Sequence, residues 1–454
     1  MAELLSLFYV LVCGLWFFAV QREGTIGIGA RYLLVVHFAS QFLVGPLVYW
    51  ISGELPIGIE EGAYDKSLWI VLMSFLAFTA GGYVVAPWWV RRQRFRQQPP
   101  LLFLQTLDMQ RQWQGAKFVL GIGFLALVLS PIVGAIPTVR AVWSQTTVLM
   151  QTGAILLCLN GLHTRRGSQV AIGVMSALGT GLFSSVSFGF FGSTLLTFLY
   201  GISLILLWRK TQVANWLILG CVCVLGLIPY NMWLSGRDAI RSGLREGASL
   251  SERVGAFWET THVPGIADLT PSAQSGRIAE RLDQSTILVA AMSYTPEIEP
   301  YAYGETIWRP MLIAIVPRAL WPDKPLSSGG NEFVSRFTGL RFGSETSVGL
   351  HPLFEFYVNF GPVGAVVGLL LLGVVAGVLD GLYFLYAPAN FFVQVLVLQI
   401  LWALIGSGTM AELTMTVPAT IVVAIGVVRV VHKYATPARM PTGVGNLATV
   451  KSLP

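Results

Sequence analysis

Long apolar runs that carry almost no charge recur along the whole chain, and they limit the folds open to it more than any other feature. A helix needs about twenty mainly apolar residues to cross a bilayer. Eleven segments approach this pattern: residues 4–20, 32–51, 68–90, 118–136, 146–162, 170–186, 190–208, 215–233, 363–386, 391–405 and 413–430. The sequence therefore predicts an all-α polytopic membrane protein with about 11 transmembrane helices and one large, partly helical periplasmic loop.

The composition excludes an ordinary soluble domain. Only 11% of the 454 residues are charged and 54% are hydrophobic, whereas about a quarter of a soluble chain is charged. The four cysteines lie inside apolar segments, where we expect small hydrophobic side chains rather than disulfide or metal partners. The first apolar segment lacks a basic start and a small-residue cleavage site, so we expect a helix and not a cleaved signal peptide.

The basic residues predict the topology. With a periplasmic N-terminus and a cytoplasmic C-terminus, sixteen Lys and Arg residues lie inside, against Lys66 and Arg140 in the short outer loops, as the positive-inside rule demands. This orientation gives an N-terminal bundle of about 8 helices over residues 1–234, a periplasmic loop over 235–352, about 3 helices over 353–435, and a disordered cytoplasmic tail over 436–454.

The loop of residues 235–352 is close to neutral, with eleven basic and thirteen acidic residues, so no nucleic-acid partner is expected. Ser249 and Glu252 have the spacing of a capping box. A second helix is expected over residues 275–292, where Arg277 and Arg281 share a face and repel unless an anion lies between them. A solvated charged face is the alternative.

The apolar run MLIAIV is bounded by Pro310 and Pro317, two residues that end helices. It is too short to span a membrane. A re-entrant or interface-lying turn that sets Arg318 near the lipid headgroups is one interpretation, and a buried strand or core turn within the loop is the other.

The segment PRALWPDKP has the highest density of residues that could bind a substrate. Arg318 offers a planar fork of donors, and Lys324 adds a compact positive charge on a backbone restricted by proline, an arrangement that suits a pyrophosphate. The alternative is an arginine that pairs with Asp323 or Glu332 to hold the loop. Trp321 and Glu332 are candidate sugar-binding residues.

His351 and Glu355 are the candidate catalytic residues. They lie four apart where the loop re-enters the membrane, so on a helix they share a face. Either side chain could take a proton from a hydroxyl nucleophile. Two further acids, Asp380 and Glu412, lie in or beside apolar segments; Asp380 is expected to reach headgroups and Glu412 to line the outer cavity. There is no HExxH motif, paired DxD motif or Cys/His cluster, so no metal or other cofactor is expected.

About a fifth of the chain resembles bacterial O-antigen polymerases of the Wzy type and related repeat-unit polymerases. The resemblance rests on the following residues in order: Arg281, Tyr303-Gly304-Glu305-Thr306, the Pro317 to Pro325 segment, and Glu355, Asn359, Phe360 and Gly361. Arg318 and Gly329 also reproduce an arginine, ten residues, glycine spacing. One departure is that this chain has a single large loop where some members have two.

The resemblance implies a metal-independent glycosyltransferase at the outer face of the bacterial inner (plasma) membrane. It would move a growing glycan from undecaprenyl pyrophosphate to a lipid-linked repeat unit. Arg318, Lys324, Arg277 and Arg281 would hold the leaving pyrophosphate, and His351 or Glu355 would activate the acceptor hydroxyl. The implied partners are the undecaprenyl pyrophosphate-linked oligosaccharide, the lipid bilayer and a chain-length regulator.

Two other function classes compete with the polymerase. An O-antigen ligase has a similar fold and would hand the finished glycan to a lipid A core. A flippase or transporter of lipid-linked oligosaccharides would be expected to carry charges in its helices and to have short loops. The long charged loop and nearly charge-free helices favour the polymerase.

Overall fold

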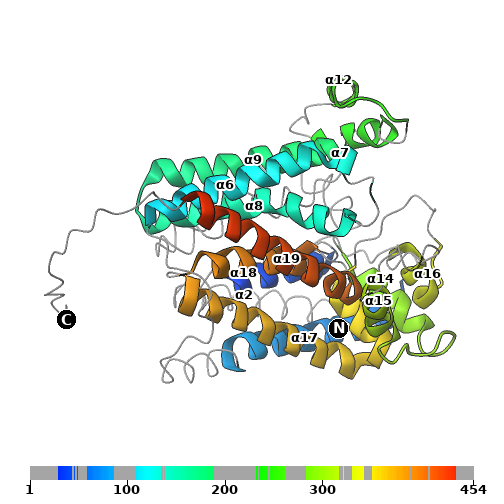
Figure 1. Cartoon of the computed structure of the whole chain (residues 1–454). Helices are drawn as coiled ribbons and strands as arrows, with labels where there is room; N and C mark the ends of the chain where they lie inside the picture. The colour runs from blue at the N-terminus through cyan, green and yellow to red at the C-terminus, as the bar shows by residue number, and fades with distance from the viewer. Residues whose placement is uncertain are drawn as a thin grey trace, which may run out of the picture.

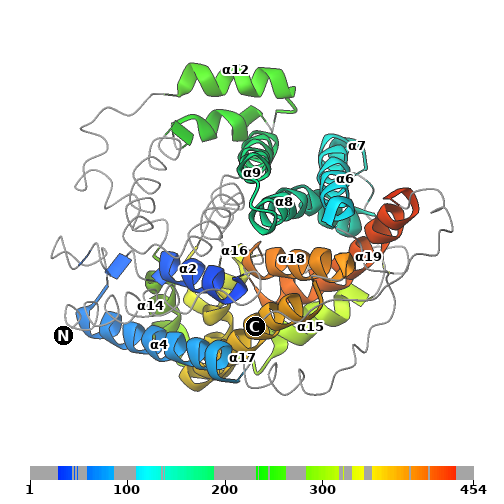
Figure 2. The ribbon, with the colours of Figure 1, turned by 90° about the vertical axis from the view of Figure 1, so that its left-hand side faces the viewer.

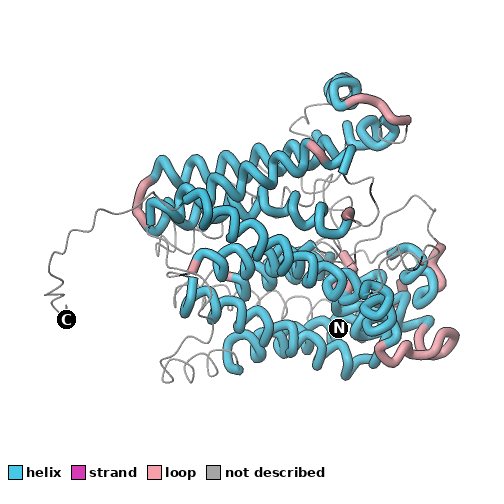
Figure 3. Tube along the Cα trace, viewed as in Figure 1, coloured by secondary structure: helices cyan, strands magenta, loops and turns pink. Residues whose placement is uncertain are grey.

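The fold is taken from a computed structural model. It describes residues 29–42, 45–46, 49, 59–85, 109–133, 136, 139–188, 232–233, 235–243, 246–261, 283–315, 321, 330–341, 350–387, 390–406 and 409–435. These residues form helices and the loops between them, without a strand (Figure 3). The expectation of an all-α chain is confirmed for this part of the sequence.

The helices of the N-terminal half are α2 (Ala30–Phe42), α4 (Glu61–Ala80) with a terminal π-helical turn η1 (Gly81–Val85), α6 (Met109–Val128), α7 (Ser130–Val133), α8 (Arg140–His163) and α9 (Gly167–Phe188). Those of the C-terminal half are α12 (Leu250–Thr260), α14 (Ser285–Tyr294), α15 (Glu305–Ile315), α16 (Gly330–Thr338), α17 (Pro352–Tyr386), α18 (Phe391–Gly406) and α19 (Met410–Ala435).

Four segments of the described chain are long and apolar enough to cross a membrane: Glu61–Val84, Val142–Leu162, Pro352–Tyr386 and Glu412–Val431. The expected count of about 11 spans is not supported. The expected spans at residues 118–136, 170–186 and 391–405 coincide with shorter apolar helices. Those at 4–20, 190–208 and most of 215–233 lie outside the described residues.

The helices pack as two groups with α18 and α19 between them (Figure 1). On one side, α8 packs between α6 and α9, and on the other α17 packs against α4 and α2. At the contact between α4 and α17, a Cβ at Gly81 would collide with the Leu370 carbonyl, and one at Gly373 with the Phe78 carbonyl. The two backbones therefore touch, as small residues permit in helix pairs within lipid.

Three helices of the long loop, α14, α15 and α16, gather at one end of the bundle, which we call the loop end, whereas α12 lies apart beside α9. At the loop end, α2 ends and α17 and α19 begin, and α14, α15 and α16 cover them (Figures 1 and 2). The capping box of α12 is confirmed: Ser249 Oγ accepts from the Glu252 N–H, and Glu252 Oε2 accepts from the Ser249 N–H at 2.7 Å.

Two local expectations need correction. For the predicted helix over residues 275–292, positions 275–282 lie outside the described residues, Asp283 and Gln284 are not helical, and α14 begins at Ser285 and continues to Tyr294. Pro310 does not open the run MLIAIV but lies inside α15. A proline there removes one backbone hydrogen bond. The contacts of α15 with α19 and α17 outweigh this local signal.

Candidate functional site

A break in α17 organises the loop end. Gly361 has φ 70° and ψ −163°, and Pro362 follows it, so the helix restarts in a new direction. Only glycine readily adopts this backbone conformation. Because proline has no N–H, the Val358 carbonyl loses its helical partner. The loop fills the gap: the Ala302 N–H donates to the Val358 carbonyl at 3.0 Å, and the Tyr303 N–H donates to the Asn359 carbonyl at 3.1 Å.

A buried polar network joins this break to α15 and α19. Asn359 Oδ1 accepts from the Gly304 N–H at 2.7 Å, and Asn359 Nδ2 donates to Thr306 Oγ1 at 2.7 Å. Thr306 Oγ1 donates in turn to Glu355 Oε1 at 2.9 Å. Glu355 Oε2 accepts from the Met410 N–H, the first of α19, where the helix dipole favours a negative charge. Glu355 thus links α17 to α15 and α19 and is fully buried.

His351 faces a different part of the molecule. It precedes α17 as its N-cap, and its Nδ1 accepts from the Leu353 N–H at 3.1 Å. The ring lies edge-on to Phe38 and Phe42 of α2, with centroids 5.1 and 5.2 Å away. Burial, reinforced by His37, lowers the pKa of His351 well below its usual range, so the imidazole is neutral and a weak base.

The expectation that His351 and Glu355 share one face is therefore wrong. Because His351 caps the helix from outside its first turn, the i, i+4 relationship does not apply. Its ring contacts α2, whereas the Glu355 carboxylate contacts α15 and α19.

A second buried carboxylate lies nearby, at Asp283 before α14. Its Oδ1 accepts from the Ser285 N–H at 2.9 Å, and Tyr49, Tyr64 and Ser285 lie around the carboxylate. Burial raises the pKa of Asp283 to about 6, against the opposing effect of the Ser285 N–H. A Cβ at Gly45 would collide with this side chain. No local pattern in the sequence signals this burial, because the residues around Asp283 come from the distant N-terminal part of the chain.

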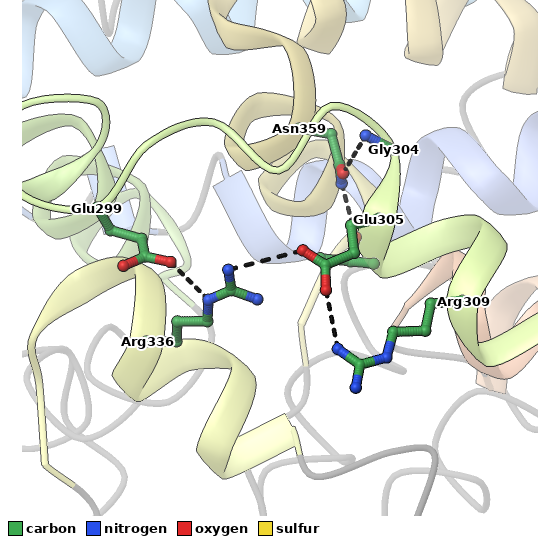
Figure 4. A network of polar contacts seen from close by, with 7 residues as sticks. Glu299, Gly304, Glu305, Arg309, Arg336 and Asn359 are labelled. Carbon is green, nitrogen blue, oxygen red and sulfur yellow. Dashed lines mark hydrogen bonds and ion pairs between the residues drawn. The ribbon is translucent and has the colours of Figure 1, made fainter.

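An exposed chain of ion pairs borders the buried network (Figure 4). Arg336 Nε lies 2.5 Å from Glu299 Oε1, and an Arg336 terminal nitrogen lies 3.7 Å from Glu305 Oε2. Glu305 Oε1 also pairs with Arg309 at 2.8 Å. The four-residue spacing of Glu305 and Arg309 could have signalled this pair from the sequence. The contact with Arg336 could not, since it joins α15 to α16.

Four predicted pyrophosphate-binding residues lie outside the described residues: Arg318, Lys324, Arg281 and Arg277. The predicted sugar-binding residues are described, and both Trp321 and Glu332 are exposed. The chain enters residues 316–329 from α15 and leaves them into α16, both at the loop end. Among the described residues, no group of three or more His, Cys, Asp and Glu side chains is arranged to hold a metal ion.

Asp380 does not reach outward as expected. It is buried, and its Oδ2 lies 2.9 Å from Arg31 Nε while its carboxylate also accepts from the Ala30 and Arg31 N–H groups. Arg31 further donates to the Gly82 carbonyl and lies over the Tyr83 ring. Glu412 is half-buried in the first turn of α19 at the loop end.

Sequence reasoning quoted Thr306 and Asn359 without giving them a role. Asn359, two residues before Gly361 and Pro362, was a usable signal, because a helix break frees carbonyls that need hydrogen-bond partners. Thr306 is distant in sequence, so only the tertiary structure brings it to the break. The comparison with protein families matches residues 103–382, more than half of the chain, to DUF8712, a domain of unknown function. The comparisons with curated proteins and with solved structures give no match. The matched region contains Thr306, Glu355 and Asn359, and the chain belongs to the DUF8712 family.

Proposed function

We propose that the protein is a metal-independent membrane glycosyltransferase of the polymerase type. It transfers a growing glycan from undecaprenyl pyrophosphate to a lipid-linked repeat unit at the periplasmic face of the inner membrane. The topology we propose has a periplasmic N-terminus and about 11 spans, of which the four long apolar segments are part.

One observation carries the proposal. The loop is anchored onto the starts of α17 and α19 through Thr306, Glu355 and Asn359. A charged loop is thereby held at one end of a bundle of apolar helices. Two lipid-linked substrates can meet only at such an end, because their carriers remain in the bilayer while their glycans remain in water.

In this proposal, arginine and lysine side chains stabilise the leaving group. A pyrophosphate that leaves from the glycan develops negative charge, which preorganised cations stabilise. Arg318 and Lys324, with Arg277 or Arg281, are the proposed cations. Asp283 and Ile315, the described residues next to these segments, belong to the loop end.

Of the two candidate bases, the geometry favours Glu355. Its carboxylate is buried and accepts a hydrogen bond from the Thr306 hydroxyl. An acceptor sugar that displaces Thr306 would reach the carboxylate and donate the same hydrogen bond. The His351 imidazole is enclosed by Phe38 and Phe42. Glu355→Gln should lower glycosyl transfer by roughly 10²–10⁴-fold.

The decisive experiment uses purified protein in nanodiscs with an undecaprenyl pyrophosphate-linked repeat unit and EDTA, with the products separated on a gel. We expect a ladder of longer lipid-linked glycans. Arg318→Ala should abolish the ladder while the protein stays inserted, and Arg253→Ala on α12 should preserve it. Glycan formed only after addition of a lipid A core would establish a ligase instead.

A second candidate function is transport of a lipid-linked glycan. Two observations favour it. Helix α17 is discontinuous at Gly361, and it contains the buried Asp380, which pairs with Arg31 of α2. Broken helices and intramembrane charges are common at transport sites. If no longer glycan forms while labelled lipid crosses a proteoliposome membrane, the transporter replaces the polymerase.

A further inference from the structure

Helix α15 lies across the bundle and not along it. Figure 1 shows α6, α8 and α9 lengthwise and α15 close to end-on, whereas Figure 2 shows those three end-on and α15 lengthwise. Its first turn is held at the loop end by Thr306. If α6, α8 and α9 are oriented across a membrane, α15 lies close to parallel with the membrane plane.

The outward side of α15 is apolar. Trp308, Met311 and Leu312 follow the i, i+3, i+4 spacing of one helical face and are 52%, 49% and 57% exposed. Arg309, whose side chain is 61% exposed, is the charged residue beside them. Thr306, in contrast, faces the buried network. A short helix in water would not be expected to expose three large apolar side chains together.

This face continues into the outer surface of α17. Phe360 and Trp308 both border Gly304, so the two helices meet there. Beyond the break, α17 exposes a stripe of apolar residues every four positions: Val363, Val367, Leu371 and Val375. Because α17 is long enough to span a membrane, this stripe is its lipid-facing side. Exposed apolar residues therefore lie on both helices where α17 meets α15.

We propose that α15 is an interfacial helix whose partner is the phospholipid bilayer. Met311 and Leu312 enter the boundary between headgroups and acyl chains, Trp308 lies at the level of the headgroups, and Arg309 reaches the lipid phosphates. The proposal depends on the long helices spanning a membrane and not on glycosyl transfer. It favours the interface over the buried turn for the MLIAIV run.

Helix α12 provides a matched contrast. It also runs across the bundle and exposes a tryptophan, Trp258, at 62%. The other exposed residues of this helix, however, are small, polar or acidic: Ser251, Glu252, Gly255, Glu259 and Thr260. Because acidic side chains are repelled by anionic lipids, we expect Trp258 to lie in water and not in contact with lipid.

The test uses the full-length protein in nanodiscs with lipids brominated near the glycerol backbone, which quench tryptophan only on contact. Trp308→Phe should remove part of the quenchable fluorescence, while Trp258→Phe should leave the quenchable part unchanged. An unchanged quenchable signal in the Trp308→Phe protein would overturn the proposal.

A nitroxide at position 312 gives a second measurement, in a chain whose four cysteines are replaced by alanine. Labels at Val367 and Ser251 calibrate the lipid and water limits. At position 312 we expect high accessibility to oxygen and low accessibility to a water-soluble nickel chelate. High chelate accessibility would refute the interfacial helix, and low accessibility to both quenchers would show that protein covers this face.

Discussion

Arg31 and Asp380 are 349 residues apart in sequence and form a buried ion pair, with Arg31 Nε 2.9 Å from Asp380 Oδ2. The pair joins the start of α2 to the last turns of α17. The Asp380 carboxylate also receives the first N–H groups of α2. A charge this far from water is stable only with its partner in place.

Removing either partner of this pair should be strongly destabilising. Arg31→Met leaves the Asp380 charge buried without its partner, at a cost of about 3–5 kcal/mol in the free energy of unfolding. The double variant with Asp380→Leu should recover part of that loss. Thermal unfolding in detergent measures the effect. Asp238→Asn, which removes an exposed partner of Arg237, is the control and should change little; equal losses in both would contradict the buried pair.

Asp283 should make the folded protein more stable in mild acid. Its folded pKa of about 6 lies above its usual value of 3.8, so the folded state binds the proton more tightly than the unfolded state. Its contribution to stability therefore falls as the pH rises from about 4 to about 6 and stays at its low value above that. Each pKa unit corresponds to about 1.4 kcal/mol, which puts the total on the order of 3 kcal/mol.

Asp283→Asn should accordingly remove this pH dependence and raise the melting temperature at pH 8. Glu252, whose pKa shifts in the opposite direction, provides the control. The Ser249 N–H lowers the pKa of Glu252, so its capping contribution is present at neutral pH and lost as the pH falls through the lowered pKa. Melting temperatures are measured from pH 4 to 8 and compared with those of the unmodified protein. The difference should rise with pH for Asp283→Asn and fall with pH for Glu252→Gln. Parallel curves would exclude a raised pKa at Asp283.

Gly361→Ala should strain the break in α17. The φ of 70° and ψ of −163° lie in a region that alanine avoids, at a cost of about 1–3 kcal/mol. The Tyr301 hydroxyl, 3.0 Å from the new Cβ, adds crowding. Gly426→Ala in α19 meets no atom within 4 Å and should be neutral or stabilising by up to about 1 kcal/mol. Denaturation of both variants checks the contrast, which disappears if α17 is continuous.

Thr306→Val should loosen α15 while the bundle stays folded. The variant keeps the shape of the side chain but loses the bonds to Glu355 and Asn359. The N–H groups of Ala302, Tyr303 and Gly304 then lose support and should exchange with deuterium about tenfold faster, as expected for about 1.4 kcal/mol. Thr260→Val, which removes a local bond on α12, should leave their exchange unchanged. Unaltered exchange in Thr306→Val would show that this network does not hold the loop.

Sequence alone determined the features that depend on neighbouring residues. The apolar runs indicated helices because lipid-like segments must satisfy their backbone hydrogen bonds internally. The Ser249 and Glu252 spacing indicated a capping box because both bonds form within one helical turn. Where the signal lies within a few residues, the pattern is enough.

Only the tertiary structure decided the partners of the polar residues. Asp380 was expected at the headgroups, yet its partner Arg31 comes from the other end of the chain. His351 and Glu355 point to different helices because a cap residue lies outside the helical repeat. Pro310 stays inside α15 because packing against α19 exceeds the cost of one lost hydrogen bond. Contacts between distant segments depend on how the helices assemble, and no local spacing encodes that.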